Sequence, residues 1–204
     1  MTLTLRLWDC LTARMWRADN AAQIVEFAVS LPLLLVFVVG IFDFSGAFTL
    51  KEKLTDAARD AARGAATDPA NDLSAAVPVS VNDAFQIVDN YLTANRISDC
   101  GITASPTPTP PLIWTYSASA SPCTGTGLKL VINRGYYFPS NSTAAASADC
   151  SAQAVAGGQT AVLSTCVIIQ YEYAWRFDKV ISLLRLSALL PTKITASAVA
   201  MNEN

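Results

Sequence analysis

The sequence predicts an α+β protein in which a long N-terminal transmembrane helix leads into an exported α/β domain with a small antiparallel sheet. Residues 27–42 contain no charged side chain, and residues 54–66 are dense in alanine, a strong helix former. Three later segments are β-branched and partly alternating, which favours strands. We therefore expect a basic leader at 1–21, the transmembrane helix with its extension at 22–66, and a globular domain at 67–204.

The composition favours a membrane anchor and argues against catalysis and metal binding. The chain has 204 residues, of which 52% are hydrophobic and 15% charged, and its mean hydropathy of +0.34 is high for a soluble domain. Histidine is absent, which excludes Ser-His-Asp and Cys-His catalysis and the commonest metal ligand. The net charge of −2 comes without a basic patch, so we expect no nucleic-acid partner. We expect no enzyme activity, cofactor or metal.

The N-terminal region combines a basic leader with an apolar run. Residues 1–20 carry three arginines, with Trp8 and Trp16 suited to a membrane interface. Helical continuation of the uncharged run to Leu50 reaches the roughly 20 residues that cross the hydrocarbon core. A cleaved secretory signal peptide is the main alternative, but no Ala-x-Ala-like site precedes Lys51. We expect the helix to remain in the mature protein.

The charges that flank this helix do not decide its orientation, because as much positive charge follows it, at Lys51, Lys53, Arg59 and Arg63, as precedes it. The C-terminal side contains four cysteines and Ser/Thr/Pro-rich segments, which suit an oxidising, exported environment. We therefore place the N-terminus in the cytoplasm.

The alanine-rich segment continues the membrane helix as one rod. Asp56 and Asp60 each precede an arginine by three residues, which predicts ion pairs along one helix face. Gly64 and the pair Asp68-Pro69 are the predicted stop signals.

A second, amphipathic helix is expected after a short loop and should end near Arg96. Ser80 and Asp83 resemble a capping box. The apolar residues that follow share one helix face, and we expect this stripe to be core: Val81, Ala84, Phe85, Val88, Tyr91 and Leu92.

The remaining sequence predicts strands that alternate with long loops. The expected strands are 128–133, 161–177 and 194–201. We expect 103–122, rich in Pro, Ser and Thr, to form a loop or an excursion at the sheet edge, and 139–160, rich in Ser, Ala and Gly, to form another long loop. Residues 177–190 are apolar but too short to span a bilayer, so we expect a packed or interface-lying amphipathic segment.

Four of the five cysteines follow the apolar run: Cys100, Cys123, Cys150 and Cys166. An even number on the exported side predicts two disulfides. Three pairings are open; loop economy favours Cys100 with Cys123 and Cys150 with Cys166. Buried free thiols are the alternative, because cysteine is among the most buried residue types.

Five segments follow one another in a fixed order: AAQIVEFA at 21–28, LPLLL at 31–35, GIFDF at 40–44, AARDAAR at 57–63 and ITASAVAM at 194–201. Together they resemble the TadE-like proteins, the minor pilins of tight-adherence pilus systems.

The resemblance implies a pilin-like subunit that is inserted in the bacterial inner membrane and used in assembling an adhesive pilus. The assembled pilus is its second implied location. Its implied partners are other pilins or pseudopilins, a prepilin peptidase, the pilus secretion machinery and the lipid bilayer. The peptidase would cut between Ala21 and Ala22, which makes Glu26 the fifth residue of the mature chain. The chain has Ala21 where a glycine usually precedes the cut.

Helix packing and assembly are assigned to Glu26, Phe27 and Pro32. A carboxylate at the edge of an apolar helix is costly unless it is paired, so Glu26 could pair with a freed amino terminus of a neighbouring subunit. The alternative is that Glu26 lies among headgroups without a partner, and this is the location we expect for Asp43. Pro32 should kink the helix and free a carbonyl, at a packing interface or as a tolerated membrane proline.

Three classes of function were compared. The first is a minor pilin or pseudopilin that acts through helix packing. The second is a membrane-tethered exported binding module outside the pilus, for which the candidate contacts are aromatic: Trp114, Tyr116, Tyr136 and Tyr137. The third, a hydrolase with paired carboxylates, lacks an acidic pair at motif spacing. The sequence favours the first class.

Overall fold

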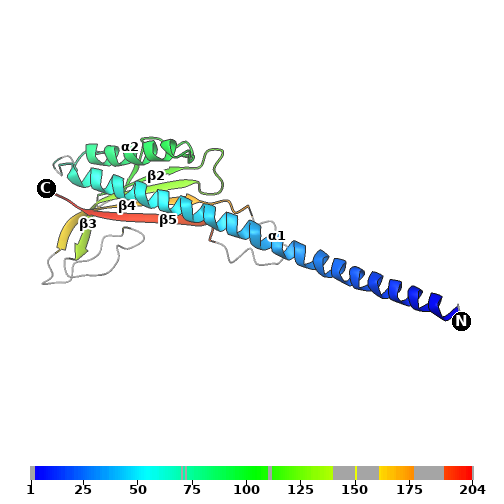
Figure 1. The fold of residues 1–204 in the computed structure, drawn as a ribbon. Coiled ribbons are helices and arrows are strands. Elements are labelled where there is room, and N and C mark those ends of the chain that lie inside the picture. Colours follow the sequence, from blue (N-terminus) through cyan, green and yellow to red (C-terminus); the bar gives the residue numbers. More distant parts are fainter. Residues whose placement is uncertain are drawn as a thin grey trace.

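The computed structural model describes residues 3–69, 71, 73–109, 112–139, 150, 161–176 and 191–203, with side chains from Ala22 onward except at 138, 139 and 161. A long helix is followed by a second helix and an antiparallel sheet, which confirms the predicted α+β class (Figure 1). The elements are α1 (Leu3–Thr67), α2 (Val79–Ala94), β1 (Thr107–Thr109), β2 (Ile113–Ala118), β3 (Leu128–Pro139), β4 (Ala161–Glu172) and β5 (Lys193–Met201).

Helix α1 is a single element of 65 residues, about 98 Å long at 1.5 Å per residue. Its N-terminal part projects away from the domain, and its C-terminal part lies within it (Figure 1). The helix includes Pro32 and ends at Thr67, before Asp68-Pro69, as predicted. Gly64 was wrong as a stop signal, since it lies inside the helix.

Gly64 instead allows α1 and α2 to approach closely. A Cβ at this position would collide with the side chain of Ile87 on α2. The buried face of α2 is the predicted stripe, although Tyr91 is only half-buried. The predicted capping box is wrong: Pro78 is the N-cap residue, and no side chain caps the helix. Ser80 lies inside the helix, two residues after the N-cap, so it cannot act as the N-cap residue.

The sheet has five strands in the order β1-β2-β3-β4-β5, each antiparallel to the next. The segment 103–122 contains β1 and β2, so a plain loop was wrong there, whereas the alternative of an edge excursion agrees with β1 at the edge of the sheet. Within β2, alternation around Trp114 and Tyr116 buries both rings, which outweighs the polar composition of the segment. Strand β1 contains Pro108, and an edge strand tolerates proline because it pairs on one side only.

Strands β3 and β4 differ from their predicted bounds. A register shift between Asn133 and Tyr136 lets β3 continue to Pro139 rather than stop at 133. This irregularity changes which sheet face the later side chains occupy. Strand β4 ends at Glu172, five residues earlier than predicted. The predictions for 139–160 and 177–190 fall almost entirely outside the described residues.

The core lies between one face of the sheet and the two helices. The C-terminal half of α1 packs on β4 and β5, and α2 packs beside α1 and toward β3 (Figure 1). The sheet contributes Leu128, Leu130, Ile132, Val167 and Ile169, all 0% exposed. The opposite face of the sheet carries a smaller cluster: Tyr136, Cys150, Cys166 and Ile168.

Candidate functional site

The N-terminal half of α1 exposes large apolar side chains around its whole circumference. Within Ala22–Thr67, an 18-residue window reaches a mean hydropathy of 2.6, and none of that window is buried against the domain. The exposed side chains include Ile24, Phe27, Leu33, Leu34, Phe37, Ile41, Phe42 and Phe48. A helix that is apolar on every side needs lipid or other helices around it, so this segment suits a membrane anchor.

Glu26 places a carboxylate on one stripe of this helix. Its side chain is exposed, and its neighbours on the stripe are Ala22, Val25, Val29 and Leu33. Among the described residues, Glu26 has no hydrogen-bond or ion-pair partner. Any partner for this carboxylate must therefore come from outside the described part of the chain.

The other two assembly residues lie close to Glu26 along the helix. Phe27 is 65% exposed, and Pro32 is exposed within the unbroken helix. The Ser30 hydroxyl donates to the Phe27 carbonyl at 3.2 Å, which is not the Ala28 carbonyl that Pro32 leaves without an amide donor. The predicted cut between Ala21 and Ala22 falls inside α1 and stays a prediction.

The apolar half of α1 meets the domain at Asp43. This side chain is only 5% exposed, and the Tyr173 hydroxyl donates to its Oδ1 at 3.1 Å and to its backbone carbonyl at 3.2 Å. Burial, followed by the hydrogen bond to Asp43, raises the pKa of Tyr173. Gly46 leaves room for the phenol, since a Cβ there would lie 3.0 Å from its oxygen. The expectation that Asp43 has no partner was wrong, whereas its location among headgroups stays a prediction.

An aromatic cluster surrounds this contact. Trp175 lies 4.9 Å from Tyr173 in an edge-on arrangement and 5.1 Å from Phe44 of α1, measured between ring centroids. The Trp175 indole donates to the Pro191 carbonyl at 2.7 Å. Sequence reasoning missed this cluster because it assigned these residues to a strand. The alternating aromatic residues Tyr171, Tyr173 and Trp175 were the available signal that this segment packs against another element.

A second contact missed from the sequence holds the other end of α1. Arg134 on β3 is fully buried and donates through Nη1 to the Ala65 carbonyl and through Nη2 to the Asp68 carbonyl, the latter at 3.0 Å. Nη1 also donates to the Thr165 hydroxyl at 2.7 Å. Terminal helix carbonyls need donors, and a cation there complements the helix dipole. Arg134 thus anchors the helix to the sheet.

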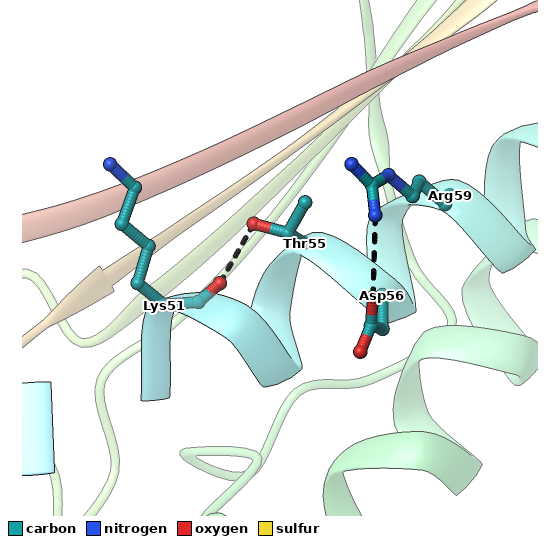
Figure 2. A network of polar contacts seen from close by, with 4 residues as sticks. All are labelled: Lys51, Thr55, Asp56 and Arg59. Carbon is teal, nitrogen blue, oxygen red and sulfur yellow. Dashed lines mark hydrogen bonds and ion pairs between the residues drawn. The ribbon is translucent and has the colours of Figure 1, made fainter. Parts of the chain in front are cut away.

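Beyond the apolar half, α1 carries a group of polar side chains at Lys51, Thr55, Asp56 and Arg59 (Figure 2). Arg59 and Asp56 form an ion pair at 3.6 Å, as predicted from their spacing. The predicted pair of Asp60 with Arg63 is not formed. The Thr55 hydroxyl donates to the Lys51 carbonyl at 2.8 Å, whereas the Lys51 ammonium extends away from the ion pair (Figure 2).

The aromatic residues considered for ligand binding are mainly core residues. Trp114, Tyr116 and Tyr136 are at most 4% exposed, while Tyr137 is 43% exposed. Tyr116 stacks on Phe85 of α2 at 4.7 Å, and burial raises its pKa to about 12. Three of the four thus serve packing.

The four cysteines beyond α1 form two disulfides. Cys100 is bonded to Cys123, and Cys150 to Cys166, the pairing that loop economy favours. The first closes the segment between α2 and β3, and the second fixes Cys150 against the outer face of β4. In the described part of the chain, no group of three or more potential metal ligands occurs.

Comparison with known proteins gives one family. Residues 21–63 match the model of the TadE-like proteins, and this stretch contains Glu26, Pro32 and Asp43. The match covers the apolar half of α1 and most of its alanine-rich half. The family that this stretch resembles takes part in tight-adherence pilus biogenesis and is not known for enzymes. Neither the curated proteins nor the solved structures gave a match.

Proposed function

We propose that this TadE-like chain is a membrane-anchored minor pilin or pseudopilin that takes part in assembling a tight-adherence pilus. The supporting observation is α1 itself. One half exposes apolar side chains on all sides, and the other half forms the centre of a folded domain. Such a subunit can be held in a bilayer and can exchange lipid for neighbouring helices while its domain stays intact.

The proposed location is the bacterial inner membrane, with the N-terminus cytoplasmic and the domain exported. The two disulfides support an oxidising environment for the domain. A reporter active only outside the cytoplasm should work when fused after Asn204 and fail when fused after Arg17. The reverse result would contradict this orientation.

Glu26 supplies the proposed specificity of assembly. A prepilin peptidase would remove residues 1–21 and leave an ammonium group at Ala22. Near hydrocarbon, the carboxylate of one subunit and the ammonium of another would each gain a partner. Other pilins, the peptidase and the pilus secretion machinery are the corresponding partners.

The test combines N-terminal sequencing with one matched pair of variants. Protein purified from membranes should begin at Ala22. Glu26→Ala should insert normally, because it makes the span more apolar, but it should lose co-purification with other pilins. Glu52→Ala removes an equally exposed carboxylate farther along α1 and should retain co-purification.

Two outcomes would count against this proposal. An intact leader on functional protein would remove the pairing mechanism. Equal co-purification of both variants would remove the role of Glu26. The membrane-tethered binding module would then become the stronger candidate, although burial of Trp114, Tyr116 and Tyr136 leaves it few aromatic contacts.

A further inference from the structure

We propose that residues 173–176, together with the facing turns of α1, form a surface that binds anionic lipid headgroups and seats the domain on the membrane. This junction surface consists of Phe44, Phe48, Lys51, Tyr173, Trp175 and Arg176. The inference concerns lipid rather than pilin partners, and it rests on the membrane anchor of the proposed function.

The junction surface lies at the level where a membrane spanned by α1 would end. From Ala22 to Phe44 the helix rises about 33 Å at 1.5 Å per residue. The hydrocarbon core of a bilayer is about 30 Å thick. If the core begins near Ala22, then Phe44 reaches the headgroup region on the side of the domain. Trp175 packs on Phe44 and is therefore at the same level.

The chemistry of these aromatics suits an interface between hydrocarbon and water. Trp175 and Tyr173 are half-buried, and the polar atom of each is already hydrogen-bonded, to the Pro191 carbonyl and to Asp43. Their rings can contact lipid without leaving a polar group unsatisfied. Phe48, one turn beyond Phe44, is 65% exposed in the same region.

Two grooves flank the segment 173–176. One, of about 290 Å³, is lined by Val39, Phe42, Asp43, Gly46, Tyr173 and Arg176. The other, of about 310 Å³ and mainly apolar, is lined by Phe44, Ala47, Phe48, Lys51, Trp175, Pro191, Lys193, Ile194 and Thr195. Each groove thus combines apolar walls with at least one cationic side chain, a combination that fits a lipid headgroup above its first acyl carbons.

The charges select an anionic headgroup. Lys51 and Arg176 are exposed, and neither makes an ion pair within the part of the chain that the structure describes. The Lys51 ammonium extends away from the Asp56–Arg59 pair (Figure 2). Asp43, the one carboxylate lining either groove, is buried and accepts the Tyr173 hydroxyl. The available charge at the junction surface is therefore positive.

The experiment measures how deep Trp175 lies in reconstituted membranes. The full chain is placed in vesicles of phosphatidylcholine, alone or mixed with phosphatidylglycerol, that carry a nitroxide either on the headgroup or deep in the acyl chain. Subtracting the fluorescence of Trp175→Phe isolates Trp175 from the other tryptophans. We expect the headgroup nitroxide to quench Trp175 more than the deep one does, and phosphatidylglycerol to increase that quenching.

Charge variants then test the headgroup preference without disturbing the core. Lys51→Gln/Arg176→Gln should lose the increase caused by phosphatidylglycerol. Arg63→Gln/Arg96→Gln removes the same charge from exposed positions that line neither groove and should keep this increase. Retention of both disulfides checks that every variant is folded.

Three results would overturn the proposal. The first is that neither nitroxide quenches Trp175. The second is that phosphatidylglycerol still increases the quenching when Lys51 and Arg176 are replaced, and the third is that the quenching falls as the protein-to-lipid ratio rises. The last would show that a second copy covers the surface. None of them affects the assembly proposal, which is measured by co-purification of Glu26 variants.

Discussion

The two halves of α1 have opposite relations between side-chain size and burial. Residues 22–48 carry large apolar side chains that the domain leaves exposed. In residues 54–66 the buried positions are nearly all alanine: Ala57, Ala58, Ala61, Ala62, Ala65 and Ala66, each at most 2% exposed. Small residues let the helix backbone approach a sheet and a second helix closely, whereas a lipid-facing helix needs apolar bulk. Hydrophobicity alone would have put the wrong half in the core.

The largest expected effect comes from removing the cation that anchors the buried half. Arg134→Ala leaves the carbonyls of Ala65 and Asp68 without this donor and opens a cavity. We expect a loss of about 3 to 5 kcal/mol in the free energy of unfolding. Denaturant unfolding in detergent measures it. Lys129→Ala, an exposed cation on the same strand, should change stability by less than about 0.5 kcal/mol.

One substitution made in both halves tests the comparison directly. Ala58→Leu inserts three carbons where α1 is fully buried, and it should destabilise the domain by about 1 to 3 kcal/mol. Ala28→Leu makes the same change on the exposed half and should leave domain unfolding unchanged. Equal effects of the two substitutions, measured by thermal unfolding in detergent, would show that the domain also packs against the apolar half of α1.

A smaller effect is expected at the boundary between the halves. Tyr173→Phe removes the hydroxyl that donates to Asp43 and should cost about 1 to 2 kcal/mol, because Asp43 is buried. The loss should be local: amide hydrogen exchange should become faster around Asp43 and stay unchanged around Ala61. Tyr137→Phe, at an exposed tyrosine, is the control. A uniform loss of protection along α1 would contradict a local role for this bond.

The sequence predicted what depends on local pattern. The rod from the apolar run through the alanines follows from composition and the absence of proline between Pro32 and Pro69, and the buried face of α2 follows from its period. The stop at Asp68-Pro69 was also readable, whereas Gly64 was misread because a glycine can serve close packing as well as helix termination.

What could not be predicted depends on residues far apart in the chain. Arg134 donates a hydrogen bond to Ala65, which lies 69 residues earlier in the chain, and Tyr173 donates one to Asp43, 130 residues earlier. Neither partner carries a local signature, since a lone arginine in a strand and a lone aspartate near an apolar run are usually solvated. Strand β2 was missed for a related reason: its burial comes from Phe85 and the helix layer, not from its own composition.

The position of β5 constrains the timing of folding during synthesis. This strand pairs with β4 and packs on α1, and the residues after it reach the same helix end, where the Glu203 amide donates to the Ala66 carbonyl at 3.3 Å. About 130 residues separate Ala66 from Ala196. At roughly 5 to 20 residues per second, ribosomes need on the order of 10 s to cover that distance. During this delay the alanine face of α1 has no sheet to cover it. The core can therefore close completely only after β5 has been synthesised.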